Sequence, residues 1–127
     1  MSRCAIAVND APVASGNYSQ AISAGGLVFV AGNGPYHPET REVVGKTIEE
    51  QTDRTMRNIE AILRGAGLDW SHVVSATVYL EHLQRDWAGF DRTYGTFLTR
   101  PYPARATTGA TLKNILVEIS VIAVMPS

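Results

Sequence analysis

The sequence predicts an α+β fold in which two helices cover one face of a mixed sheet. Three observations predict it: a periodic helical segment in the first half of the chain, an alternating segment after it, and an apolar segment close to the C-terminus. The predicted order is strand, strand, helix, strand, helix, strand, strand. The 127 residues show no repeat or low-complexity linker, so we expect a single domain over residues 1–127.

The first two strands are expected to form a hairpin. In "SQAISAGGLVFVAGNGP", a turn at Gly25 and Gly26 separates two short runs, and residues 27–31 are apolar and β-prone. The following segment, "GNGPYHPETREVVGK", is rich in glycine and proline and predicts a surface loop.

The first helix is expected over residues 47–64. Thr47 and Glu50 have the spacing of a capping box, and glycines at positions 65 and 67 end the segment. Its apolar face follows the helical period: Ile48, Thr55, Met56, Ile59, Ile62 and Leu63. Two pairs of opposite charge spaced four apart, Asp53 with Arg57 and Glu50 with Arg54, predict weak ion pairs on the solvent face.

The second half of the chain predicts a strand, a helix and two further strands. "VVSATVYLEHL" alternates and is rich in β-prone residues. Asp86 is the expected N-cap of the second helix, whose apolar face would hold Trp87, Phe90, Tyr94, Phe97 and Leu98. Residues 104–110 and 115–125 are the last strands. Two helices leave the other sheet face bare, which favours oligomerisation.

Composition disfavours several classes of function. The formal net charge is −1 and basic residues are scattered, so nucleic-acid binding is not expected. No metal-ligand spacing relates the only cysteine, Cys4, to the three histidines, His37, His72 and His82, or the histidines to one another. The segment "GNGP" lacks the lysine of a phosphate loop. We therefore expect no metal and no cofactor. The longest apolar run is interrupted by Glu118, so no membrane span is expected, and the predicted location is the cytoplasm.

Three residues are candidates for a site. Arg105, in "PYPARATTGA", is a permanent cation among small neighbours and needs an anion. Glu118 interrupts "ILVEISVIAV", where an unpaired carboxylate is unfavourable. It is either a charge that protects an edge strand or a partner of Arg105 in a cleft, and spacing alone leaves both open. Tyr18, in "GNYSQ", would by itself be a packing tyrosine.

The sequence resembles the Rid (YjgF) family of imine and enamine deaminases from about residue 9 to residue 125. The resemblance is carried by "APVASGNYSQAISAGGLVFVAGNGP", "EEQTDRTMRNIEAILRGAGL", "VVSATVYL", "YPARAT" and "LVEISVIAV", in this order. It implies a chorismate-mutase-like fold, a homotrimer, and ligand clefts between subunits.

The resemblance also implies roles for individual residues. Arg105 would bind the carboxylate of an imino acid, Glu118 would hold the attacking water, and Tyr18 and Gly32 would line the pocket with Thr107. A guanidinium grips a carboxylate through two parallel hydrogen bonds, and hydrolysis of an electrophilic imine carbon needs only a held substrate, a placed water and a route for protons. The expected partner is a small-molecule carboxylate substrate.

Several positions depart from the family pattern. Ala31 and Asn33 replace a frequent serine and glutamine, and Asn17 replaces a proline. Thr107 stands where many members have a pocket cysteine, and Asp91 where an asparagine is frequent. The turn "TLKN" lacks the usual Leu-Pro. These changes leave open a non-catalytic trimeric binder of small carboxylates, or a paralogue acting on a different imine.

Overall fold

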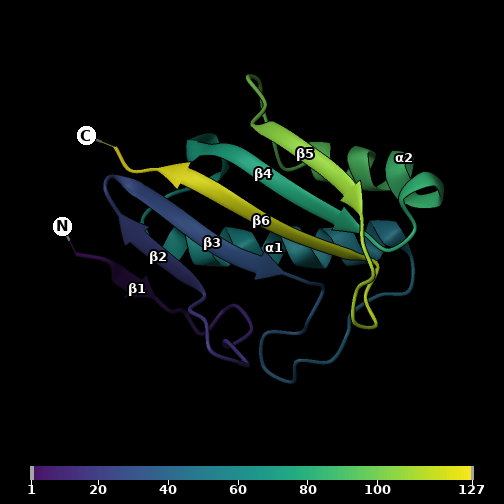
Figure 1. Ribbon diagram of the computed structural model, residues 1–127, viewed down its shortest axis with the longest axis horizontal. Helices are drawn as coiled ribbons and strands as arrows, with labels where there is room; N and C mark the ends of the chain where they lie inside the picture. The colour runs from purple at the N-terminus through teal and green to yellow at the C-terminus, as the bar shows by residue number, and fades with distance from the viewer. Residues whose placement is uncertain (1, 127) are drawn as a thin grey trace.

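The computed structural model describes residues 2–126, which form the predicted succession of elements with one additional strand (Figure 1). In chain order these are β1 (Cys4–Ile6), β2 (Ala21–Ala24), β3 (Leu27–Asn33), α1 (Ile48–Gly65), the short 3₁₀ helix η1 (Trp70–His72), β4 (Val73–Leu80), α2 (Leu83–Gly95), β5 (Ala104–Gly109) and β6 (Val117–Val124).

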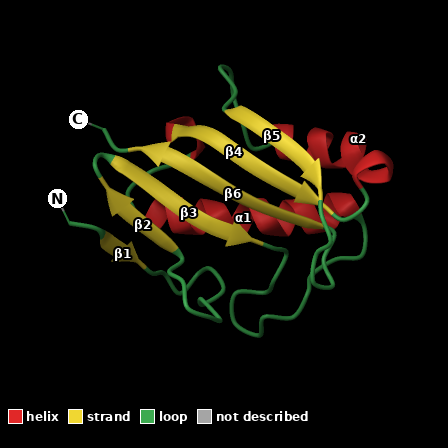
Figure 2. Ribbon diagram, in the orientation of Figure 1, coloured by secondary structure: helices red, strands yellow, loops and turns green. Residues whose placement is uncertain are grey.

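The strands form one mixed sheet in the order β1-β2-β3-β6-β4-β5. β4 and β5 pair in parallel, and the other neighbours are antiparallel. Both helices lie on the same face of this sheet, as Figure 2 shows. The predicted fold class is therefore confirmed. In the described part of the chain, neither helix is long and apolar enough to cross a membrane.

Alternation along the strands separates a covered face from an open one. In β6, Val117, Ile119 and Val121 are buried under the helices, while Glu118 and Ser120 alternate with them and project to the open face. The open face also carries Phe29 of β3, which is 42% exposed. The bare sheet face expected from the sequence is thus present in the single chain.

Helix α1 begins as predicted. Glu50 N donates to Thr47 Oγ1 and Thr47 N donates to Glu50 Oε1, both at 3.1 Å, so the capping box is complete. Because Glu50 is used in this cap, the expected Glu50–Arg54 pair is replaced by the cap itself. The Asp53–Arg57 pair does form, at 2.8 Å.

A buried polar side chain on α1 fixes the loop that follows β3. Asn58 is fully buried, and its Nδ2 donates to Gly34 O at 3.1 Å and to Tyr36 O at 2.8 Å. Backbone carbonyls in a loop need such partners when they are shielded from water. The helix therefore holds in place a loop whose composition alone predicted only surface exposure.

Helix α2 starts earlier than the sequence predicted. It begins at Leu83, and Asp86 lies in its first turn, where Asp86 N donates to His82 O at 2.9 Å. The prediction of Asp86 as the N-cap is therefore wrong. Its carboxylate is buried and forms two hydrogen bonds with Arg85, at 2.9 and 3.0 Å. Because β4 ends at Leu80 and α2 begins at Leu83, three helical residues precede Asp86.

Strand β1 was not predicted because three residues carry too little alternation to stand out. Its position depends on Gln20, a buried side chain next to β2. Gln20 Oε1 accepts from Val8 N at 2.7 Å, and Nε2 donates to Val8 O at 3.1 Å and to Pro12 O at 2.8 Å. One side chain thus holds the N-terminal segment against the sheet.

Candidate functional site

Arg105 lies on β5, the edge strand, and projects toward α2. Its register partner on β4 is the buried Ala76, so Arg105 shares the covered face of the sheet. The guanidinium carbon lies 4.8 Å from the centre of the Tyr94 ring, 5.3 Å from that of Phe90 and 5.4 Å from that of Trp87. Three aromatic rings within this range stabilise the cation and restrict its position.

The anion that Arg105 contacts in the chain itself is Asp91. Arg105 Nη1 donates to Asp91 Oδ1 at 2.6 Å. The Arg105 side chain is 17% exposed and that of Asp91 is 53% exposed, so the pair lies at a surface that opens to solvent on the Asp91 side.

Both residues of this pair line a pocket of about 380 Å³ between the end of α2 and the start of β5. The volume is enough for a small organic acid. Burial raises the pKa of the Tyr94 hydroxyl, and the charge of Arg105 opposes that effect in part. The principal lining residues are Asp91, Tyr94, Leu98, Tyr102, Pro103 and Arg105.

Thr107 is two residues further along β5 and projects to the same face as Arg105. Its Oγ1 is buried, and no hydrogen-bond partner for it lies among residues 2–126. A buried hydroxyl without a partner is unfavourable. Thr107 therefore adds an unsatisfied polar atom next to the strand position of Arg105.

A second cluster, formed around Gly32 and Glu118, lies on the open face of the sheet. A Cβ at Gly32 would lie 2.7 Å from Glu118 Oε2 and 3.0 Å from Glu118 Cδ. Glycine is therefore needed at this position for the carboxylate to lie across β3.

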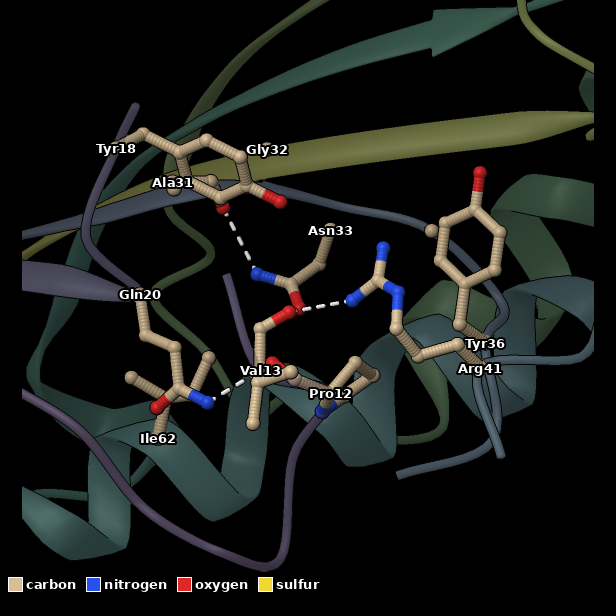
Figure 3. A pocket seen from close by; sticks show the side chains of 11 residues that line it. Pro12, Val13, Tyr18, Gln20, Ala31, Gly32, Asn33, Tyr36, Arg41 and Ile62 are labelled. Atoms are coloured by element: carbon tan, nitrogen blue, oxygen red, sulfur yellow. Dashed lines mark hydrogen bonds between the residues drawn. The ribbon is translucent and has the colours of Figure 1, made fainter. Parts of the chain in front are cut away.

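Tyr18 and Gly32 line a small hollow with two residues of the loop after β3, Tyr36 and Arg41 (Figure 3). Arg41 Nη2 donates to Ser15 Oγ at 3.1 Å, Nη1 donates to Val13 O, and the guanidinium lies 5.2 Å from the Tyr36 ring centre. The hollow holds about 30 Å³, which is room for a water molecule.

Two tyrosine hydroxyls in this second cluster have shifted acidities. Hydrogen bonds with Ser15 lower the pKa of Tyr18, and the charge of Arg41 acts in the same direction. Burial raises the pKa of Tyr36; Arg41 opposes this shift and the charge of Glu118 adds to it. The cluster thus combines one carboxylate, one guanidinium and two phenols whose pKa values are shifted in opposite directions.

Within one chain, the alternative in which Glu118 is a partner of Arg105 in a cleft is wrong. Strand β4 lies between β5 and β6, so the two strands are roughly 10 Å apart. Glu118 is on the open face and Arg105 on the covered face. The alternative in which Glu118 protects an edge strand is also wrong, because β6 lies between β3 and β4.

The structure therefore divides the sequence-predicted residues into two groups. Tyr18, Gly32 and Glu118 lie close together. Arg105 and Thr107 lie on the covered face of the sheet, on the edge strand β5. Tyr36 and Arg41 were not predicted as site residues, since both lie in a segment whose composition predicts only a loop. A positive φ of 62° at Arg41, on a residue other than glycine, is unusual and marks the position.

We expect Gly32→Ala to displace the Glu118 carboxylate while leaving the fold intact. The atoms that must move are the far end of a flexible side chain, so the free energy of unfolding should change by no more than about 1 kcal/mol. A crystal structure and a thermal melt of the variant would check both parts. Gly109→Ala is the matched control, because a Cβ there makes ordinary contacts of 3.5 Å or more. An unmoved Glu118 in Gly32→Ala would contradict the expectation.

Metal chemistry finds no support in the described residues. Across 2–126, no three histidine, cysteine, aspartate or glutamate side chains gather in a way that could hold a metal ion.

The sequence is similar to those of known proteins over most of its length. A family model described as Endoribonuclease L-PSP matches residues 8–125. RutC family protein SSO3206 of Saccharolobus solfataricus is 41% identical over 115 residues, covering 89% of this chain and 90% of that protein. Reactive Intermediate Deaminase A, chloroplastic, of Arabidopsis thaliana is 37% identical over 122 residues, covering 94% of this chain and 65% of that protein.

A solved structure of similar sequence has the same fold as this chain. The crystal structure of E. coli TdcF with bound serine superposes with a TM-score of 0.89 at 30% sequence identity, covering 97% of this chain and 99% of that one. With the family model matched over nearly the whole length, the chain belongs to the Endoribonuclease L-PSP family, which is the Rid (YjgF) family.

Proposed function

We propose that this protein hydrolyses reactive 2-imino and 2-enamino acids to 2-oxo acids and ammonia without a cofactor. The observation that carries the proposal is Arg105, held over three aromatic rings at a pocket of about 380 Å³. Membership in a family that contains a reactive intermediate deaminase supports the reaction class. The bound serine of TdcF supports a small amino-acid-like ligand.

Arg105 is suited to orient a substrate carboxylate. Its guanidinium has five donors in a planar fork, and Nη1 is the one paired with Asp91. The remaining donors can form the two-point contact that sets both the position and the orientation of a carboxylate. Because the aromatic rings hold the guanidinium, little freedom is lost when the ligand binds.

The hydrolysis itself needs a placed water and a proton acceptor. The water oxygen forms a bond to the imine carbon, and its proton passes to a base. The nitrogen of the tetrahedral adduct then takes up a proton. The C–N bond breaks while the hydroxyl group of the adduct gives its proton to the base, so ammonia leaves and the carbon becomes the ketone of the 2-oxo acid. Glu118, close to Gly32, is the carboxylate that would orient the water and accept its proton.

The two clusters can act on one substrate if they come from different subunits. Within one chain, Arg105 and Glu118 lie on opposite faces of the sheet, and the open face carries exposed apolar side chains such as Phe29 and Val124. We propose a homotrimer in which the Arg105 pocket of one subunit faces the Glu118 cluster of the next. Covering the open face would also bury this apolar surface. The cytoplasm is the proposed location.

Light scattering should therefore give a mass close to three times the 13.7 kDa of the chain at micromolar concentration. We propose that burial of Phe29 contributes to the association, so Phe29→Asp should shift the mass toward that of the monomer. Arg64→Asp, at an exposed position on α1, serves as the control. A monomeric parent protein would remove the basis for a site shared between subunits.

An imine-hydrolysis assay tests the reaction. An amino-acid oxidase generates a panel of 2-imino acids in the presence of the protein, and a nucleophile such as semicarbazide traps the imine that is not hydrolysed. We expect the protein to lower the amount of trapped imine in proportion to its concentration. If the rate equals that of the buffer for every imine in the panel, the proposed activity is wrong.

A second candidate function is non-catalytic binding of small carboxylates. The observation that favours it is the separation of the two clusters, since the Arg105 pocket in one chain has no access to Glu118. This candidate predicts saturable binding of 2-oxo acids by calorimetry together with no acceleration of imine hydrolysis.

A further inference from the structure

The pocket next to Arg105 contains a carboxylate of its own, and its charge bears on which ligands can bind. We propose that Asp91 and Arg105 together select zwitterionic ligands, so that the pocket prefers the protonated 2-imino acid to the anionic 2-oxo acid. The inference rests on the proposed function only in taking Arg105 as the group that binds the substrate carboxylate.

The geometry places two opposite charges side by side on one wall. Asp91 Oδ1 is 2.6 Å from Arg105 Nη1, and both side chains line the same pocket. Among the described residues that line it, these two carry the only formal charges. Asp91 is half exposed, so its second carboxylate oxygen is free to accept a hydrogen bond from a ligand that enters.

Electrostatics then separates two classes of ligand. Arg105 attracts the carboxylate of a bound monoanion, whereas the Asp91 carboxylate beside Arg105 repels it. A simple monoanion has no cationic group that would offset this repulsion. For unit charges about 5 Å apart, this repulsion corresponds to a loss of affinity of roughly 4-fold to 300-fold, as the effective dielectric constant falls from that of water to that near a protein surface. A ligand with a cationic nitrogen beside its carboxylate replaces the repulsion by an attraction.

Substrate and product of the proposed reaction differ in this respect. A protonated imine has the group C=NH₂⁺ next to the carboxylate, and both of its N–H groups can donate to a carboxylate oxygen. A 2-oxo acid has a ketone oxygen at the same place, which accepts hydrogen bonds and is repelled by Asp91. The pair would therefore hold the substrate and favour release of the product. It would also stabilise the protonated imine, whose carbon is the better electrophile.

Alanine and pyruvate are stable probes for this selection. They share a carboxylate and a methyl group and differ in an ammonium against a ketone, so titration calorimetry compares the two charges directly. We expect the parent protein to bind alanine about tenfold more tightly than pyruvate. In Asp91→Asn, which retains an oxygen for Arg105 but loses the charge, the ratio of the two dissociation constants should fall by about tenfold. Asp53→Asn, which breaks the exposed pair with Arg57 on α1, is the matched control and should leave the ratio unchanged.

Several outcomes would overturn the inference. These are a parent protein that binds pyruvate as tightly as alanine, a parent protein that binds neither at millimolar concentration, and an unchanged ratio in Asp91→Asn. The parent ratio needs no variant, so a folding defect cannot obscure the result. Because both probes are unreactive, the measurement is independent of turnover. Selective binding combined with an inactive imine assay would reject the deaminase and retain the selectivity of the pair.

Discussion

Arg105→Lys should reduce kcat/KM for imine hydrolysis by about 10²-fold or more, and Arg105→Ala should abolish it. Lysine keeps the charge but has no planar fork, so it cannot set the orientation of the substrate carboxylate. Misplacement of a substrate by about 1 Å is enough for losses of this size. Steady-state kinetics with the oxidase-coupled imine panel would measure the effect.

The stability of these Arg105 variants has to be compared at the same time. Loss of the contacts with Tyr94, Phe90 and Trp87 should lower the free energy of unfolding by roughly 1–2 kcal/mol, with lysine intermediate. Arg64→Lys is the matched control, because Arg64 forms an exposed pair with Glu60 on α1 and does not line the pocket. If Arg105→Lys keeps the kcat/KM of the parent protein, Arg105 does not orient the carboxylate.

Glu118→Gln should lower kcat by about 10²-fold to 10⁴-fold while leaving the affinity for an unreactive 2-oxo acid nearly unchanged. Glutamine retains the volume and most of the hydrogen bonds but cannot accept a proton from water, and positioned proton-transfer groups contribute rate factors of this size. Substrate binding depends on Arg105 in the other cluster, so the two effects should separate. Single-turnover kinetics and calorimetry on the same variant would measure both.

Glu60→Gln is the control for the Glu118 variant. Glu60 pairs with Arg64 on α1 at 3.6 Å and faces away from the open side of the sheet. It should leave kcat as in the parent protein. Full activity of a correctly assembled Glu118→Gln protein would remove Glu118 from the mechanism, and another group, such as Tyr18 or Tyr36, would then have to accept the proton.

Local patterns in the sequence predicted the elements that depend on near neighbours. The capping box and the apolar period of α1 involve residues within a few positions of each other, and both are present in the structure. The same holds for the face of Glu118, because Val117 and Ile119 beside it are strongly apolar and must face the core. For Arg105 no such contrast exists. Its neighbours Ala104 and Ala106 are small, so the sequence does not show which parity of β5 is buried.

Only the tertiary structure decided the order of the strands and the pairs between them. β6 lies between β3 and β4, where both of its edges are hydrogen-bonded and Val117, Ile119 and Val121 are buried, and no short segment of the sequence encodes this position. This order places β4 between Glu118 on β6 and Arg105 on β5, which the sequence had suggested as partners. The Arg105–Asp91 pair joins residues 14 positions apart on a strand and a helix, and the contact of Arg41 with Tyr36 depends on the loop that Asn58 fixes. Residue types and local periods set which groups could serve a site, whereas non-local packing set which of them meet.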